Sequence, residues 1–337
     1  MASGPINVGT IHPALNRVLD VFPADTAARA AAALQTLLRE RVSAGGARAW
    51  SSSRLNGDGF PVEIAFTTAD DRLRYTLEPA GCDISPQQRL EAAIQLINAL
   101  SPAALPADVA DTFRSIQQFD GLAFGAWIGG RHSSADSQYK IYVEMPDRDA
   151  EDASLSALLS DRLGEYPAPR LFDRFASPRM VAFTPAVDLW EFYYRVKSLA
   201  PHHVPGVLAP VGLAAQAQEL LGYIQDAYGY ALRERLPGES VGISYTARGR
   251  LSEAQSVTLF LCARALLSDD ARIRQQFGRL SQAFGWDDSR YQQITVPLAA
   301  RRTWKTYHGI MGITLTRAGQ MALSMGLSPR DPSAVGE

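Results

Sequence analysis

The stretch NGDGFPVEIAF, residues 56–66, is followed closely by LRYTLEPAG, residues 73–81. Both stretches alternate apolar and polar side chains with a period of two, which is typical of β-strands. The first places a lone carboxylate, Glu63, between Val62 and Ile64. A charge inside an otherwise apolar strand is unfavourable unless it has a partner or a task. This pair of strands therefore raises the question of what lies on their polar side.

The same pattern recurs along the chain, because helical stretches alternate with pairs of short strands. Short connections within each pair predict antiparallel hairpins. The predicted strands lie at 60–66, 72–78, 121–130, 138–145, 179–186, 189–197, 240–247, 256–263, 308–316 and 320–327. The predicted helices lie at 12–22, 25–42, 85–100, 107–119, 152–166, 213–236 and 269–286. These five helix–strand–strand units predict an α+β protein whose ten strands close into a barrel, with the helices outside and no exposed sheet edge.

The two faces of each predicted strand differ in character. In the fourth strand, for example, Tyr139, Ile141 and Val143 share an apolar face. Helices outside a barrel need apolar surface to pack on, so we expect the apolar faces to point outward and the polar faces to line the interior. The polar faces carry four cations and two neighbouring tyrosines: Arg74, Lys140, Arg195, Lys197, Tyr142 and Tyr193.

Such an interior is strongly cationic. Burying several cations without partners is costly, so the pattern predicts an anionic ligand. Tyrosines beside the cations can donate hydrogen bonds to an anion and present their ring faces to a carbocation. The alternative is that the polar faces are solvated outer surfaces with surface salt bridges, and the alternation alone leaves this open.

The overall composition excludes several classes of protein. The chain has 337 residues, 46% of them hydrophobic, and no shift in composition marks a linker, so we expect a single domain over residues 1–337 with a core at about 10–330. The 33 basic and 35 acidic residues give no support for nucleic-acid or membrane binding. Cys82 and Cys262 lie far apart, which fits a reducing cytosol. With neither a signal peptide nor a long apolar run, a cytoplasmic protein is expected.

The first hairpin resembles the aromatic prenyltransferases of the dimethylallyltryptophan synthase type. In that family a Pro-x-Glu strand is followed by an arginine strand that runs into Glu-Pro, as in GDGFPVEIAF and LRYTLEPAG here. The KIY of residues 140–142 is similar to the family's Lys-x-Tyr strand. The likeness covers roughly residues 10–330 and implies the ABBA barrel, which consists of ten antiparallel strands around an internal active site. The short chain suits a bacterial indole prenyltransferase rather than a fungal one.

The resemblance implies a role for each matching residue. Glu63 corresponds to the catalytic base that holds an indole N–H. Arg74 corresponds to the first diphosphate-binding arginine, and Lys140 and Tyr142 correspond to the next diphosphate strand. Trp127, Ala65 and Phe260 are expected in the pocket for the acceptor and the prenyl group.

The strand at 189–197 departs from the family pattern, which often shows Arg-x-Lys-x-Tyr. This chain has Tyr193, Arg195 and Lys197 at alternate positions, which supplies the same chemical types in another order. We assign all three to the diphosphate, although Tyr194 instead of Tyr193 is a further option for the inward residue. In the last two units Thr258, Phe260 and Ser324 are the candidates for interior positions.

The activity implied is a Friedel–Crafts alkylation that moves a dimethylallyl or longer allylic group from its diphosphate to tryptophan or a tryptophan-derived indole, in secondary metabolism. The cations stabilise the leaving diphosphate, and the tyrosines shield the allylic cation from water. The implied co-substrate is dimethylallyl or geranyl diphosphate. No cofactor and no metal is expected, and the protein is expected to be a monomer or homodimer.

Other functions stay open at this point. A phenol, phenazine or peptide acceptor would use the same donor site. A non-catalytic barrel that carries an anionic or aromatic small molecule would need the cations but not Glu63. Glu63 also has a structural alternative, an ion pair with Arg74 on the adjacent strand.

Motifs for other chemistry are weak. The pairs of aspartates, at 70–71, 269–270 and 287–288, do not form the DDxxD motif of magnesium-dependent isoprenoid synthases and fit helix starts or turns. His202 and His203 fit a loop. Gly129 and Gly130 lack the strand-to-helix context of a nucleotide-binding loop.

Overall fold

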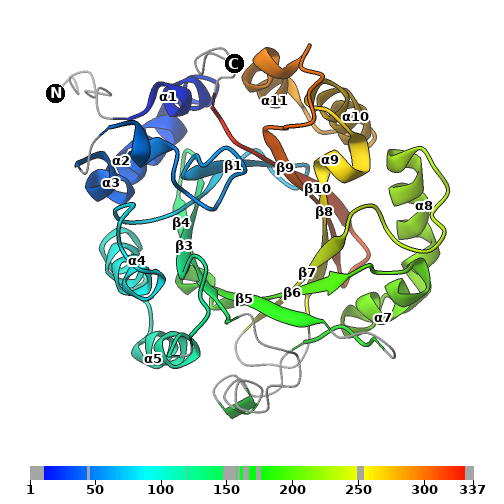
Figure 1. Cartoon of the computed structure of the whole chain (residues 1–337), viewed down its shortest axis with the longest axis horizontal. Coiled ribbons are helices and arrows are strands. Elements are labelled where there is room, and N and C mark those ends of the chain that lie inside the picture. Colours follow the sequence, from blue (N-terminus) through cyan, green and yellow to red (C-terminus); the bar gives the residue numbers. More distant parts are fainter. Residues whose placement is uncertain are drawn as a thin grey trace.

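The computed structural model describes residues 11–43, 46–118, 120–146, 157, 160–161, 167–171, 176–248 and 254–330. Ten strands in this part of the chain form a closed antiparallel barrel (Figure 1). Each strand pairs with its neighbours in sequence, and β1 closes the barrel by pairing with β10. The strands are β1 (Val62–Thr67), β2 (Leu73–Leu77), β3 (Ala126–His132), β4 (Ser137–Glu144), β5 (Ser177–Thr184), β6 (Leu189–Lys197), β7 (Ser240–Arg248), β8 (Ser256–Cys262), β9 (His308–Thr316) and β10 (Met321–Leu327). The predicted antiparallel barrel is confirmed.

Helices surround the barrel as an outer ring, with the strands enclosing the central opening (Figure 1). They are α1 (Pro13–Leu19), α2 (Ala24–Leu37), α3 (Arg39–Ser43), α4 (Pro86–Leu100), α5 (Ala107–Ile116), α7 (Val204–Leu208), α8 (Ala217–Tyr228), α9 (Ala263–Leu267), α10 (Asp270–Gln282) and α11 (Ser289–Ile294). Most of the helix predicted at 152–166 lies outside the described residues. Within the described residues, no helix has both the length and the apolar character needed to cross a membrane.

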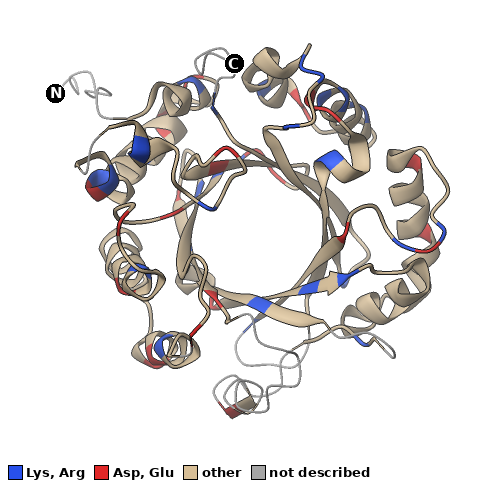
Figure 2. Ribbon diagram, viewed as in Figure 1, with Lys and Arg blue, Asp and Glu red and all other residues tan. Residues whose placement is uncertain are grey.

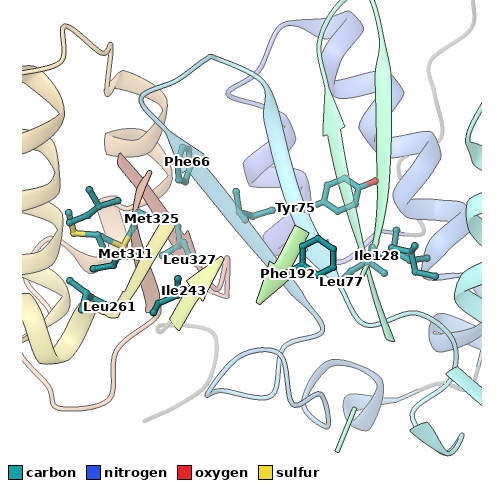
Figure 3. Packing of buried hydrophobic residues seen from close by; sticks show 14 of the residues in the cluster. Phe66, Tyr75, Leu77, Ile128, Phe192, Ile243, Leu261, Met311, Met325 and Leu327 are labelled. Carbon is teal, nitrogen blue, oxygen red and sulfur yellow. The ribbon is translucent and has the colours of Figure 1, made fainter. Parts of the chain in front are cut away.

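The core lies between the barrel and the helices. On β1, Val62, Ile64 and Phe66 are each at most 5% exposed, and on β4 Ile141 is fully buried. Figure 3 shows outward side chains of several strands, such as Met311 and Met325, against the surrounding helices. The apolar faces therefore point outward, and the expected assignment of the polar faces to the interior is confirmed for the middle of the strands.

Two glutamates near strand ends do not follow that assignment, although the alternation places them on polar faces. Glu78, directly after β2, is buried and accepts hydrogen bonds from Arg41 (2.6 Å) and Ser53 (3.1 Å). Glu144, the last residue of β4, accepts backbone N–H bonds at 2.5–2.9 Å from the loop at 123–125. Because a buried carboxylate needs such donors, these residues fasten helix and loop segments to the barrel instead of lining it.

Candidate active site

The barrel encloses a cavity of about 710 Å³ that is lined from all ten strands. Figure 2 shows charged residues on the strands around the central opening as well as on the outer helices. Most of the residues expected at a donor site line this cavity, together with the candidates of the last two units: Ala65, Arg74, Lys140, Tyr142, Tyr193, Thr258, Phe260 and Ser324. These residues of widely separated strands therefore share one cavity.

Four predicted site residues do not line this cavity. Glu63 lies one inward position before Ala65 on β1, toward the start of the strand. Trp127 stacks on Phe124 with ring centroids 3.8 Å apart. Arg195, which is partly buried, and Lys197, which is exposed, lie toward the end of β6. The expectation that Arg195 and Lys197 join the other cations around one ligand is thus not met by the geometry of the cavity.

The orientation of β6 follows from its two adjacent tyrosines. Tyr193 lines the cavity, whereas Tyr194 points outward and its hydroxyl donates a hydrogen bond to the Pro167 carbonyl oxygen (2.9 Å). The register left open by the sequence therefore has Tyr193 inside.

Two cations of the cavity have carboxylate partners within the protein, so a bound anion is not the only group that offsets their charge. Lys140 Nζ lies 2.7 Å from Glu191 Oε1, and Arg74 is paired with Asp70. The Tyr193 hydroxyl also donates a hydrogen bond to Glu191. Burial alone raises the pKa of Glu191, but the charges of Lys140 and Arg131 outweigh it and hold the pKa below its usual value.

Two arginines line the cavity from neighbouring strands. Arg74 on β2 and Arg131 on β3 stand directly opposite each other in the strand register, and both line the cavity. Burial and the Arg131 charge lower the pKa of Arg74, against the opposing effect of Asp70. Like charges at directly opposed positions are destabilising, so this pair indicates a place that an anion can occupy favourably.

Sequence reasoning gave no role to several residues of this wall. Arg131, Arg248 and Glu191 line the cavity, and all follow from the two-residue alternation of their strands. The wall formed by β7 to β10 is rich in hydroxyl groups: Ser244, Thr246, Ser256, Thr258, Thr314, Thr316 and Ser324. Some of these hydroxyls bond one another, as in Thr246–Ser256 (2.6 Å) and Thr258–Thr314 (2.8 Å).

Aromatic rings form a continuous group beside Lys140. Its ammonium lies 4.9 Å from the centre of the Tyr142 ring, and the Tyr142 and Tyr193 rings are 5.9 Å apart. Tyr193 in turn stacks with Phe260 at 6.0 Å. Electron-rich ring faces of this kind attract and shelter a cation.

Glu63 occupies a niche made by glycines of the neighbouring strands. A Cβ atom at Gly326 of β10 would lie 2.7 Å from Glu63 Oε2, and one at Gly309 of β9 would lie 3.1 Å from the same atom. The strand register places Thr76 opposite Glu63 and Ala65 opposite Arg74, and within the described residues Glu63 forms no ion pair with Arg74. Burial raises the pKa of Glu63 to about 7. The carboxyl group is therefore poised to exchange a proton near neutral pH.

The weaker motifs have structural roles. Gly129 and Gly130 lie within β3, where a Cβ at Gly130 would come 2.3 Å from the Tyr75 ring and one at Gly129 would come 3.0 Å from the Tyr142 ring. Asp269 caps α10 by accepting a hydrogen bond from the Arg272 backbone. No group of three or more His, Cys, Asp or Glu side chains in the described residues is arranged to hold a metal ion.

No family model and no curated protein matches the chain. Among solved structures, a 6-dimethylallyl tryptophan synthase matches with a TM-score of 0.74 at 18% identity, over 97% of each chain. The 5-dimethylallyl tryptophan synthase of Streptomyces coelicolor, solved in complex with DMASPP and Trp, matches with a TM-score of 0.74 at 15% identity, over 94% of this chain and 93% of that one. The 6-dimethylallyltryptophan synthase of Micromonospora olivasterospora, also in complex with DMASPP and Trp, matches at 0.72 and 19%, over 94% and 95%.

The matches extend over nearly the whole chain, and they therefore include the closed antiparallel barrel described above. The chain therefore has the ABBA barrel fold of the aromatic prenyltransferases.

Proposed function

We propose that the protein is an aromatic prenyltransferase that moves a dimethylallyl group from its diphosphate to an indole, with tryptophan or a tryptophan-derived metabolite as the acceptor. The observation that carries this proposal is the placement of Arg74, Arg131 and Lys140 in one cavity wall next to the rings of Tyr142 and Tyr193. An anionic leaving group and an allylic cation need these two environments side by side. The solved barrels that hold DMASPP and Trp support the choice of donor and acceptor.

In the proposed reaction the allylic C–O bond breaks first, and the diphosphate takes the bonding electrons. Arg74, Arg131 and Lys140 stabilise the charge that develops on the leaving oxygen, and they are held in place by strands before the reaction begins. Tyr142 and Tyr193 face the allylic cation and keep water from it. An indole carbon then attacks the cation, and loss of a proton restores the aromatic ring.

Glu63 is the proposed base and the group that orients the acceptor. A carboxylate can accept a hydrogen bond from the indole N–H, which makes the ring more nucleophilic as the proton is shared. The lack of a Cβ at Gly309 and Gly326 leaves room for its oxygens, and a pKa of about 7 suits a group that must both accept and release a proton. The assignments that the resemblance implies for Trp127, to the acceptor and prenyl pocket, and for Arg195 and Lys197, to the diphosphate, stay proposals.

Gly326→Ala is expected to displace the Glu63 carboxylate, because the new Cβ would lie 2.7 Å from Oε2. Since small displacements of a catalytic group are costly, we expect kcat/KM to fall about tenfold or more with little change in folding. Gly309→Ala, with its milder contact of 3.1 Å, should have a smaller effect, and Gly57→Ala, which has open space, serves as the control. Equal values of kcat/KM for all three variants would contradict the proposal that these glycines position the Glu63 carboxylate.

The experiment that tests the proposed function is a mass-spectrometric assay of turnover. Dimethylallyl and geranyl diphosphate are each combined with tryptophan, other indoles, phenols, phenazines and tryptophan-containing peptides, with and without EDTA. We expect an indole product that carries the allylic group in place of one hydrogen, and we expect it to persist in EDTA because side-chain cations bind the diphosphate. Products on phenols alone would move the proposal to another acceptor class, and binding of diphosphate without any product would favour a carrier barrel. Activity lost in EDTA and restored by magnesium would contradict the metal-independent donor site.

Some broader assignments accompany this proposal. A single functional domain is supported by one barrel whose strands run from Val62 to Leu327. A cytoplasmic location is supported by two free thiols, Cys82 and Cys262, which suit a reducing compartment. A role in secondary metabolism and a monomeric or homodimeric state are part of the same proposal.

A further inference from the structure

A carboxylate inside a cavity that binds a diphosphate is an unexpected group. Glu191 on β6 lines the same cavity as the cations, and its side chain is only 9% exposed. Lys140 Nζ lies 2.7 Å from one of its oxygens, and the Tyr193 hydroxyl donates to the other. A diphosphate that contacts Lys140 must therefore share the ammonium with a negative charge that belongs to the protein.

Asp70 offers a natural comparison, because it pairs with the other strand cation, Arg74. Its side chain is 36% exposed, about as open to solvent as a surface group, so water can screen its charge. Its other oxygen accepts a hydrogen bond from the backbone of Arg72 in the turn before β2. Glu191 lacks this access to solvent and is held by two partners, so water screens its charge less than it screens that of Asp70.

The groups around Glu191 define the charge that a diphosphate meets. Lys140 faces it from β4, Tyr193 neighbours it on β6, and the charge of Arg131 acts on it from β3. In the strand register Ala182 of β5 and Thr246 of β7 stand opposite Glu191 and add no charge. The carboxylate thus offsets part of the positive charge of Lys140 and Arg131.

We propose that Glu191 is a fixed internal counter-ion that competes with the diphosphate for Lys140, weakens its binding and so promotes release of the diphosphate product. This inference rests on the proposed function and deepens it. Without an internal anion, the arginines and the lysine would bind the diphosphate product tightly. With Glu191 present, Lys140 can form its ion pair with Glu191 as the product leaves, which lowers the cost of release. In this role Glu191 acts through its charge on Lys140 and touches no reacting atom, so it is not a catalytic residue.

The test is calorimetric titration of inorganic pyrophosphate into wild type, Glu191→Gln and Asp70→Asn. Glu191→Gln keeps the shape and an acceptor oxygen for Tyr193 but removes the charge. We expect it to bind pyrophosphate about tenfold more tightly, with a steeper loss of affinity as salt is added, because one more net positive charge faces the ligand. Asp70→Asn, which removes an equal but solvent-screened charge, should change the affinity about twofold or less. Glu191→Asp should restore affinity close to that of the wild type.

Steady-state kinetics give a second test, because a purely structural role of Glu191 would not produce the changes in kinetic constants that the counter-ion role predicts. Glu191→Gln should lower KM for the allylic diphosphate and strengthen inhibition by pyrophosphate, while kcat falls if product release limits turnover. If Glu191→Gln does not fold, Glu191→Ala removes the same charge and is expected to bind pyrophosphate more tightly as well.

The outcomes separate this inference from the proposed function. Wild-type protein that binds no pyrophosphate overturns both, since there is then no donor site. Wild-type binding with unchanged or weaker binding by Glu191→Gln overturns the counter-ion role alone and shows that Glu191 only positions Lys140. An effect of Asp70→Asn as large as that of Glu191→Gln would also overturn it, because burial would then make no difference.

Discussion

Lys140→Ala is expected to lower kcat/KM for the allylic diphosphate by about 10²–10³, the usual result of removing one fixed group that stabilises a developing negative charge. Lys140 is 8% exposed and is held between Glu191 and the Tyr142 ring, so its position does not depend on solvent. The substitution also leaves Glu191 without its main positive partner, which adds repulsion of the diphosphate.

The double variant Lys140→Ala, Glu191→Gln separates these two contributions. It should recover part of the lost rate, because the uncompensated carboxylate is gone, but it should stay well below wild type. Lys305→Ala, which removes an exposed lysine far along the chain, serves as the matched control for loss of one positive charge. Normal turnover by Lys140→Ala would contradict the assignment of the donor site to this wall.

Glu63→Gln is expected to reduce kcat for indole substrates by about 10²–10⁴, the range over which a positioned general base accelerates proton transfer. The variant keeps the size of the side chain within the glycine niche but cannot take up a proton. An N-methylindole analogue has no N–H to donate. Wild-type protein should therefore turn it over more slowly than the parent indole, whereas Glu63→Gln should turn over the two compounds at nearly the same low rate. Equal rates of wild type and variant on an indole would remove the base from the mechanism.

The pH dependence gives the same residue a separate test. The base works in its ionised form, and burial raises the pKa of Glu63 to about 7. Wild-type kcat/KM should therefore fall as the pH drops below about 7 and level off above it. Glu63→Gln should lose this acidic limb while keeping its low rate across the range, and an acidic limb retained in the variant would assign the titration to another group.

The strands could be predicted from the sequence because a barrel wall with helices outside forces a strict alternation. β9 was predicted at its observed bounds, whereas β3 begins at Ala126, later than expected, because the residues before it form a loop that Glu144 fastens. Gly125, directly before β3, has a φ of 79°, a conformation that favours glycine and prevents the strand from extending further toward the N-terminus. The pattern of apolar residues alone carries no such signal.

The site was predicted in part for a related reason. Alternation tells which residues of a strand share a face, so Arg74, Lys140 and Tyr142 are expected in the interior, whereas the choice between Tyr193 and Tyr194 needed the structure. It does not tell how far along the barrel axis a residue lies, and Lys197, at the end of β6, is exposed. The ion pair of Lys140 with Glu191 joins β4 to β6 across the intervening β5, and strand register at that distance cannot be read from the sequence.

A crystal structure with tryptophan and an unreactive thiolodiphosphate analogue of the donor would show where both proposed substrates bind in the barrel. We expect diphosphate oxygens within hydrogen-bonding distance of Arg74, Arg131 and Lys140, the allylic chain against Tyr142 and Tyr193, and the indole N–H directed at Glu63. A diphosphate bound away from these cations, or an indole nitrogen that points away from Glu63, would contradict it.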